Sequence, residues 1–329
     1  MDLNYRKIVV LTPIKNEEWI LDTFLKTTSC FADHILIANQ NSDDNGMLIA
    51  KKYPKVDIIE NNSTAFNEAE RQTLLINTAR EKYGENNILL AIDADEILAF
   101  SSLKSNEWEN IRSSEAGTVL FFEKPTFYDG VKQVIRYEEQ GGWPLGFIDD
   151  GSKHKPEFIH STRIPFNENS PTLFLNEIKF LHCNLLSLSR QRAKMRYYCI
   201  LESIANSKPW YHRLRMYHSS YNYAKQEGDG LAPAPQKWTD GWIKQGIIFK
   251  NPKEEEFYWY DRESLKLLDQ YTFRKFWLED IWDIKWNKVG DHFNLSNIKY
   301  KKPSVIKSLY REALFHIVNF AFFIKGLKT

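Results

Sequence analysis

The chain has few of the residues that mark several specialised classes of protein. Its 329 residues include 3 cysteines, none in a CxxC pair, so neither a disulfide framework nor a zinc-ligand pattern is indicated. The 14 glycines and 12 prolines are too few for a fibrous or low-complexity chain. We therefore expect the cysteines to be structural thiols in a reducing compartment. They are Cys30, Cys183 and Cys199.

The chain also lacks an excess of charge and a long apolar run. Its 44 Lys and Arg residues nearly balance 43 Asp and Glu residues, which gives a nucleic-acid partner no electrostatic support. The N-terminus goes into an apolar strand candidate without the hydrophobic segment of a signal peptide. We therefore expect a folded cytoplasmic protein that binds no nucleic acid.

Apolar runs alternate with amphipathic segments over the first hundred residues. The runs are typical of buried strands and the segments of helices, so the pattern predicts an α/β, Rossmann-like fold with a mostly parallel sheet flanked by helices. Pro13 is expected to end the first strand and Asn16 to cap the first helix. The expected strands are 8–12, 34–38, 56–59 and 88–92, and the expected helices are 16–29, 47–53 and 67–83.

Two carboxylates follow the fourth expected strand in the sequence Asp93-Ala-Asp95-Glu96. Open α/β sheets bind ligands at the carboxyl ends of their strands. On an extended backbone Asp93 and Asp95 point to the same side, so both can converge on one divalent cation and the phosphates that it bridges. The alternative is a simple turn in which each Asp binds its own backbone.

Three motifs in this order resemble the family 2 glycosyltransferases of the GT-A fold, of the bacterial surface-polysaccharide or lipopolysaccharide-core type. They are Val10–Glu18 (VLTPIKNEE), Ile37–Asp44 (IANQNSDD) and Asp93–Glu96 (DADE). The second motif usually begins with Asp, whereas this chain has Asn39, whose amide can still hydrogen-bond a uracil edge. The resemblance implies an inverting transfer from a nucleotide-sugar donor, a UDP-sugar, to a saccharide or lipid-linked saccharide.

The resemblance also implies roles for individual residues. Asp95 would be the principal ligand of Mn²⁺ or Mg²⁺, and Asp93 would contact the ribose or the metal. His182, after a strand-like segment, would add a nitrogen ligand, although a core histidine is the alternative. Arg71 is either a phosphate contact or a solvated helix residue. The implied donor-binding residues are Pro13, Asn16, Glu17, Asn39, Arg71 and Asp93.

The middle of the chain is expected to complete the site. An inverting transfer needs a base. Asp150 or Asp149, in the glycine-rich loop expected over 141–151, is a candidate alongside Glu157. The alternative for the Asp pair is a turn cap before Gly151. His160 is expected to fix a loop or contact the acceptor. Arg192, on a basic helical face, either clamps the diphosphate or is solvated.

We expect two regions, a catalytic domain over 1–200 and an α-rich, aromatic-rich region over 201–329, with a linker at 228–235. The aromatic residues either form a core or stack on sugars. Segment 299–329 carries seven Lys or Arg and one Glu, and its apolar stretch of 12 residues is too short to span a bilayer. It is expected either to lie on the inner face of the membrane or to dock on the protein.

Two other functional classes remain open. A nucleotidyltransferase also combines carboxylates, a metal and a nucleotide, but it normally has a glycine-rich basic loop after its first strand. The segment Thr12-Pro-Ile-Lys-Asn16 lacks such a loop. A non-catalytic sugar-binding scaffold on the same fold would be favoured if the acidic motif were missing, and the motif is present.

Overall fold

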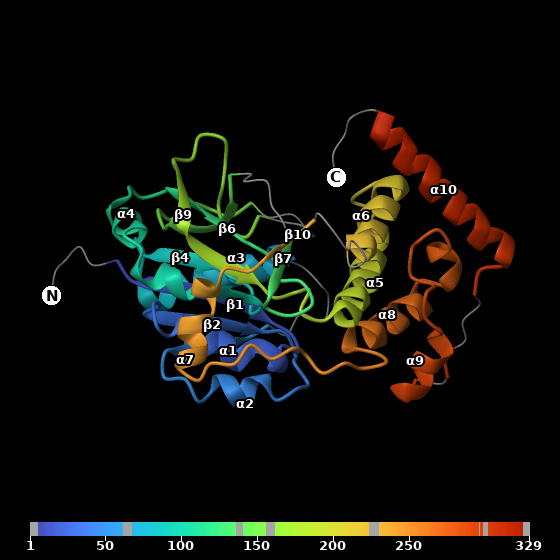
Figure 1. The fold of residues 1–329 in the computed structure, drawn as a ribbon, viewed down its shortest axis with the longest axis horizontal. Helices are drawn as coiled ribbons and strands as arrows, with labels where there is room; N and C mark the ends of the chain where they lie inside the picture. Colours follow the sequence, from blue (N-terminus) through green and yellow to red (C-terminus); the bar gives the residue numbers. More distant parts are fainter. Residues whose placement is uncertain are drawn as a thin grey trace. The chain divides into compact units, whose positions relative to one another are not determined.

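A computed structural model describes residues 6–61, 68–135, 141–155, 162–223, 230–295, 297–298 and 302–324. The chain divides into two compact units (Figure 1). The first comprises residues 1–186 and 228–253, and the second comprises 187–227 and 254–329. The first unit contains an eight-stranded sheet in the order β3-β2-β1-β4-β8-β6-β9-β5.

Four parallel strands form the N-terminal half of the sheet. Each is followed by a return segment, so all four carboxyl ends lie along one edge, here called the carboxyl edge. The fold class expected from the sequence is therefore confirmed. The strands are β1 (Ile8–Ile14), β2 (His34–Asn39), β3 (Val56–Glu60) and β4 (Ile88–Ala91).

The other half of the sheet mixes strand directions. β8 (Trp143–Ile148) is antiparallel to β4 and to β6 (Val119–Glu123), so β6 runs in the direction of β4. β9 (Thr172–His182) is parallel to β6, and β5 (Glu96–Leu98) is antiparallel to β9. The end of β9, the start of β5 and the start of β8 consequently lie at the carboxyl edge.

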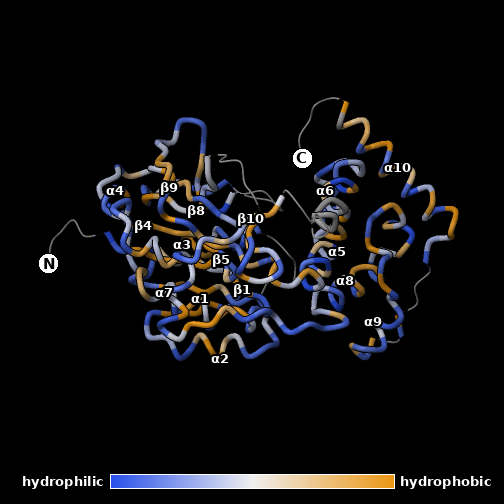
Figure 2. The backbone as a smooth tube through the Cα atoms, viewed as in Figure 1, coloured by the Kyte–Doolittle hydropathy of each residue, from blue (hydrophilic) through white to orange (hydrophobic). Residues whose placement is uncertain are grey.

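Helices cover both faces of the sheet because β1 is apolar on both sides. Ile8 and Val10 belong to a core with α1 (Glu18–Thr28), whereas Val9 and Leu11 pack in a second core with α3 (Glu68–Tyr83). Figure 2 shows many apolar residues along the strands of the first unit. The remaining short helices of this layer are α2 (Gly46–Ala50), η1 (Phe100–Lys104) and α4 (Glu107–Ser113).

β1 continues beyond the point that its sequence predicts. Pro13 lies inside the strand, opposite Ala38 of β2, rather than ending it. In a parallel strand, alternate residues direct their backbone groups to opposite neighbours. Ile14 accepts from Gln40 on the β2 side and Leu11 accepts from Ile92 on the β4 side, so Pro13 faces β4. Its missing N–H is not needed there, because pairing with β4 ends at Leu11.

Asn16 does not cap α1, so that expectation was wrong. The N-cap is Glu17, and Asn16 has a left-handed backbone with φ 56°. Asn tolerates this conformation better than most residues do. Its side chain instead hydrogen-bonds Asp43 in the loop after β2, which ties the two polar loops together.

Segment 230–253 packs in the first unit, although we expected 228–235 to be a linker. β10 (Leu231–Pro233) pairs with β7 (Gln133–Ile135), and η2 (Gln236–Trp238) and α7 (Asp240–Lys244) follow. The buried Trp242 indole donates to Leu98 O at 2.8 Å. The division into units also falls at 186–187 rather than at residue 200.

Replacing Gly241 by alanine should destabilise the first unit. A Cβ there would lie 2.0 Å from Phe100 Cδ1, a ring already packed edge-on against Trp242. Overpacking of this kind costs roughly 1–3 kcal/mol. Urea denaturation should show the loss, whereas Ile243→Ala, at an exposed position of the same helix, should change stability by less than about 0.5 kcal/mol. Equal midpoints for Gly241→Ala and the unmodified protein would contradict the proposed packing.

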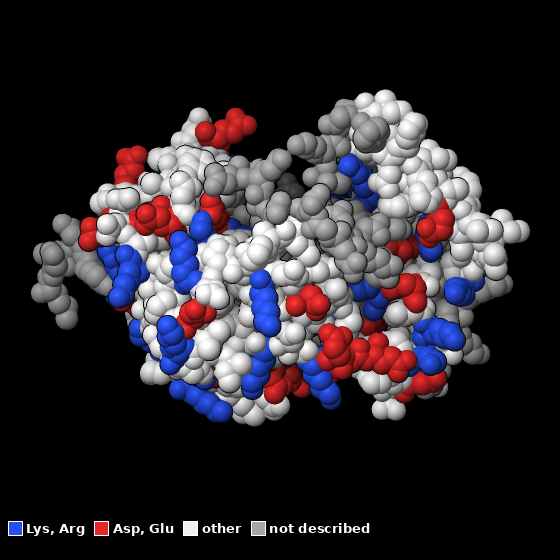
Figure 3. Space-filling view, viewed as in Figure 1, with Lys and Arg blue, Asp and Glu red and all other residues white. Residues whose placement is uncertain are grey.

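The second unit is helical and has its own core around Trp286, Phe276 and Leu268. None of the described helices is long and apolar enough to cross a membrane. Basic and acidic side chains are interspersed on the face shown in Figure 3. The elements of this unit are α5 (Leu188–Ala205), α6 (Trp210–Tyr223), α8 (Trp259–Gln270), η3 (Phe273–Phe276), α9 (Trp286–His292) and α10 (Val305–Ile324).

Candidate functional site

The acidic motif forms a turn at the carboxyl edge, between β4 and β5. Glu96 N donates to Asp93 O at 3.0 Å, so the segment is bent and not extended as the sequence predicted. The bend sends the two Asp side chains to different partners. Arg163 binds the Asp93 carboxylate, while the Asp95 carboxylate lies 4.0 Å from His182 Nε2. The acidic motif is therefore a turn, and its two Asp side chains lie at the carboxyl edge.

Glu96 is the centre of the ionic network. Its fully buried carboxylate binds Arg163 Nη1 at 2.6 Å and Lys124 Nζ at 3.0 Å, and it also accepts from Asp93 N at 3.0 Å. Burial alone would raise the pKa of Glu96, but Arg163 and Lys124 outweigh burial and hold this pKa well below its usual value. Glu96 is thus an anion that fixes two cations and the backbone of the turn.

Asp95 and His182 meet because β5 and β9 are paired. Glu96 is the register partner of His182, which brings the imidazole beside the preceding residue. Asp95 is only 4% exposed, and Thr126 Oγ1 lies 3.4 Å from His182 Nδ1. Cys183 N donates to Asp95 O at 2.7 Å. Within the described ranges, no three His, Cys, Asp or Glu side chains are grouped to hold a metal, and Asp95 and His182 are a pair.

Polar loops after β1, β2 and β3 lie along the same edge. Asn16 Nδ2 donates to Asp43 at 2.7 Å, and Trp19 Nε1 donates to Glu17 at 2.6 Å. Asn39, at the end of β2, donates to Glu60 at 2.8 Å and accepts from Ser42 N at 3.1 Å. Glu60 therefore supplies a carboxylate beside the position where the second motif has an amide instead of Asp.

Arg71 and Pro13 also belong to this edge of the first unit. Arg71 is half-buried in the first turn of α3, and this helix begins after β3 and runs back toward the start of β4. Its start is therefore near the carboxyl ends of the strands. The sheet topology thus brings all six residues named from the resemblance to the carboxyl edge.

Asp149 and Asp150 lie at the opposite edge of the sheet, so their assignment as catalytic bases was wrong. β8 is antiparallel to β4, and Asp149 N donates to Asn87 O at 2.9 Å, just before β4 begins. Asp93 is five residues beyond Ile88, about 17 Å at 3.3 Å per residue. Asp149 is buried in an ion pair with Arg80 at 2.7 Å, and Asp150 caps a turn by accepting from Ser152 N at 2.9 Å.

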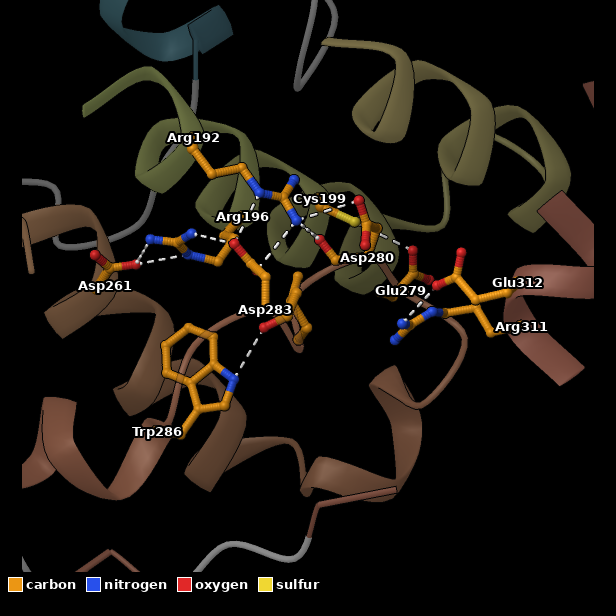
Figure 4. A network of polar contacts seen from close by, with 11 residues as sticks. Arg192, Arg196, Cys199, Asp261, Glu279, Asp280, Asp283, Trp286, Arg311 and Glu312 are labelled. Carbon is orange, nitrogen blue, oxygen red and sulfur yellow. Dashed lines mark hydrogen bonds and ion pairs between the residues drawn. The ribbon is translucent and has the colours of Figure 1, made fainter. Parts of the chain in front are cut away.

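Arg192 belongs to an ionic network inside the second unit, which corrects the expectation of a donor contact or a solvated face (Figure 4). It is buried and binds Asp283 at 3.0 Å and Asp280 at 3.2 Å. Arg196 joins Asp283 to the buried Asp261. These charges hold α5 against the C-terminal helices. His160 and Glu157 lie outside the described residues.

Arg163 and Lys124 are site residues that the sequence argument missed. Neither lies in one of the three motifs, and Arg163 follows β4 by some 70 residues in the chain. The only sequence signal is indirect. A carboxylate at the end of an apolar strand, such as Glu96, requires a cationic partner if it is buried, but the pattern does not say which cation.

No protein-family model matches this chain, and no curated protein matches it. Solved structures with partial likeness include a mycobacterial protein (16% identity, 36% of this chain, 42% of that chain, TM-score 0.28). Another is Mycobacterium tuberculosis glucosyl-3-phosphoglycerate synthase in complex with Mn²⁺, UDP and glucosyl-3-phosphoglycerate (17%, 37% and 44%, 0.26). A third is 4-diphosphocytidyl-2C-methyl-D-erythritol synthase (12%, 74% and 100%, 0.29). The chain thus spans less than half of the first two.

Proposed function

We propose that the protein is a metal-dependent, inverting glycosyltransferase of the family 2 type, which moves a sugar from a UDP-sugar to a saccharide acceptor. The observation that supports this most is the meeting of Asp95 and His182 at the carboxyl edge, beside a fixed acidic turn. An edge of this kind is where α/β folds bind nucleotides. The three sequence motifs all end at this edge.

The donor set of Asp95 and His182 fits a divalent cation. One carboxylate and one imidazole favour Mn²⁺ over Mg²⁺, and the few protein ligands leave positions for the diphosphate oxygens. When bound, the metal would act as a Lewis acid for the leaving diphosphate. Asp93 would orient the donor ribose, with Arg163 fixing its carboxylate. Glu96 would hold Arg163 and the turn in place.

The loop residues would bind the nucleotide. Pro13, Asn16 and Glu17 would line one side of the base and ribose, and Arg71 would contact the phosphates from α3. Asn39 would face the uracil edge, where its amide can donate or accept. The carboxylate of Glu60, 2.8 Å from Asn39 Nδ2, would return to this position the charge that Asn39 lacks.

A thermal-shift screen tests the proposed donor site. The purified protein is mixed with UDP-, GDP-, CMP- and dTDP-linked sugars, each with Mn²⁺, Mg²⁺ or EDTA. A ligand that binds only the native state raises the midpoint of thermal unfolding. At a ligand concentration of a hundred times Kd, it stabilises the native state by about 2.7 kcal/mol. We expect a shift with UDP-sugars and Mn²⁺ that EDTA removes. The absence of any shift in a folded sample would contradict the proposal, and pyrophosphate release from UTP and a sugar 1-phosphate would favour a nucleotidyltransferase.

The C-terminal helix suggests that the acceptor is lipid-linked. α10 buries Phe315 and Val318, while an opposite stripe of apolar side chains is 54–78% exposed. Segment 299–329, which contains this helix, is strongly basic, with seven Lys or Arg and one Glu. We propose that this stripe binds an anionic membrane at its cytoplasmic face. It consists of Ile306, Leu309, Tyr310, Ile317, Phe320 and Ile324.

Vesicle co-sedimentation tests the membrane contact. We expect the protein to sediment with vesicles that contain phosphatidylglycerol and much less with phosphatidylcholine alone. Ile317→Asp should abolish the association, whereas Leu48→Asp, at an exposed apolar position of α2, should not. Equal sedimentation of the two variants would contradict a contact through α10, and concentration-dependent dimerisation without lipid would assign the stripe to a second copy.

A further inference from the structure

The first unit contains a cavity of about 580 Å³, and residues 93–96 of the acidic motif are not among its lining residues. Its walls come from the end of β6, the start of β8, the bulged middle of β9 and the segment after β10. These parts lie on the side of the sheet where β4 ends. The side chains that matter most for its chemistry are Glu123, Lys124, Trp143, Phe174, Asn176 and Trp238.

Two aromatic rings in the cavity wall are only half covered by protein. Trp143 is 49% exposed and Phe174 is 51% exposed, although both belong to strands of the main sheet. Phe121 stacks on Phe174 with ring centroids 4.8 Å apart and so holds its ring in position. Exposed, fixed rings suit a ligand with both an apolar face and polar edges.

Backbone geometry fixes the position of Trp143. Gly142, the preceding residue, has φ +78°, and a Cβ there would lie 3.0 Å from Phe122 O. Only glycine accepts both the left-handed backbone and this close approach. Gly142 thereby lies against β6, so the indole is presented from a strand start that packs on its neighbour.

Polar groups accompany the rings. Glu123, the one carboxylate among the described lining residues, is held by an ion pair with Lys179, and Asn176 offers an amide. Trp238 is 8% exposed, and its indole N–H has no hydrogen-bond partner in the part of the chain that the structure describes. A buried donor without a partner costs free energy that a ligand oxygen would recover. This combination of ring faces, acceptors and donors matches the hydroxyl groups and C–H faces of a pyranose.

Lys124 connects the cavity to the acidic motif. Its ammonium group lies 3.0 Å from the Glu96 carboxylate and 4.4 Å from the centre of the Trp143 ring, so one side chain contacts both. Lys124 covers one part of the indole, and the exposed half remains for a ligand. The cavity is therefore adjacent, through one side chain, to the turn that carries Asp93 and Asp95.

We propose that this cavity is the acceptor subsite and that it binds a pyranose ring of a saccharide on the exposed part of Trp143. Calling the bound saccharide an acceptor rests on the proposed glycosyltransferase function. Trp143 and Phe174 supply the stacking surface, and Glu123 and Trp238 bind hydroxyl groups. A sugar bound here lies next to Lys124 and hence next to the proposed donor site.

Saturation-transfer NMR tests the subsite directly. The probes are the methyl glycosides of glucose, galactose and mannose, each added to the full-length protein. We expect saturation of the ring protons of at least one glycoside and about tenfold weaker binding in Trp143→Ala, the loss expected for one stacking contact. Trp210→Ala, at a partly exposed tryptophan in α6, is the matched control and should bind as the unmodified protein does. Phe174→Ser is a second variant that should weaken binding through the same surface.

The outcomes separate the subsite from the donor site. Glycoside binding that is absent, or equal in Trp143→Ala and Trp210→Ala, overturns the subsite even if UDP and Mn²⁺ still raise the melting temperature. Loss of the glycoside signal when UDP is added would also overturn it, because the cavity would then be part of the donor site. Binding that depends on Trp143 without any nucleotide shift would support the sugar subsite and contradict the transferase.

Discussion

Replacing Glu96 by glutamine should lower the free energy of unfolding by about 3–5 kcal/mol, the usual cost of removing one partner from a buried ion pair. The carboxylate has no exposed surface, and its loss removes the charge that pairs with Lys124 and one of the two that pair with Arg163. Urea denaturation followed by circular dichroism measures the change. Asp22→Asn, which removes an exposed ion pair with Lys26, is the control and should cost less than about 1 kcal/mol.

The same carboxylate predicts a pH dependence. The pKa of Glu96 is lowered in the folded state, so its contribution to stability is present above its unfolded pKa of about 4.3. It is lost as the pH falls below that value through the folded pKa. The difference between the unmodified protein and Glu96→Gln should therefore shrink in acid. A constant difference between pH 7 and pH 3 would show that Glu96 acts through packing and not charge.

A second substitution separates charge from packing at this site. Lys124→Met removes the cation that loses its ion-pair partner in Glu96→Gln, whereas Arg163 still has Asp93. The double variant should therefore be more stable than the sum of the single losses predicts, because the neighbours are coupled. Additive losses would indicate that Lys124 and Glu96 do not stabilise each other.

The sequence was sufficient for the parallel half of the fold because each of its strands is an apolar run with a polar end. Topology then brings Asn16, Asn39 and the acidic motif to one edge, as expected. The antiparallel β8 could not be recognised, since a strand's direction depends on pairing rather than on its own residues. Because β8 is antiparallel to β4, Asp149, which follows β8, lies at the edge opposite the acidic motif.

Ion-pair partners that are distant in the sequence could not be predicted either. Helical periodicity indicates that Arg192 and Arg196 share a face, but it does not tell a solvated face from one buried against Asp283. The same holds for Arg163, which reaches Glu96 across 67 residues of sequence. Similarly, Gly and Pro in 228–235 suggest a linker, whereas Trp238 and Trp242, which follow this segment, are buried in the first unit.

Replacing Asp95 by alanine should abolish metal-dependent donor turnover and leave the fold intact. Asp95 is 4% exposed beside His182, and the two are the only residues of the described ranges that we assign to the metal. Removing a group that stabilises the leaving diphosphate should slow turnover at least about a hundredfold. Release of UDP from the donor, with Mn²⁺ or EDTA, measures the rate, and circular dichroism checks the fold.

Asp150 provides the matched control for Asp95, because it is a carboxylate of the same sheet at the opposite edge. Asp150→Ala should retain turnover, since this side chain only caps a turn through Ser152 N. His182→Ala should keep the fold but need more Mn²⁺ for half-maximal turnover, because one of two protein ligands is lost. Full turnover by Asp95→Ala, or a Mn²⁺ requirement unchanged in His182→Ala, would remove that residue from the metal site. A hundredfold loss of turnover in Asp150→Ala would instead indicate that Asp150 is catalytic. That result would contradict a site at the carboxyl edge, because Asp150 lies at the opposite edge of the sheet.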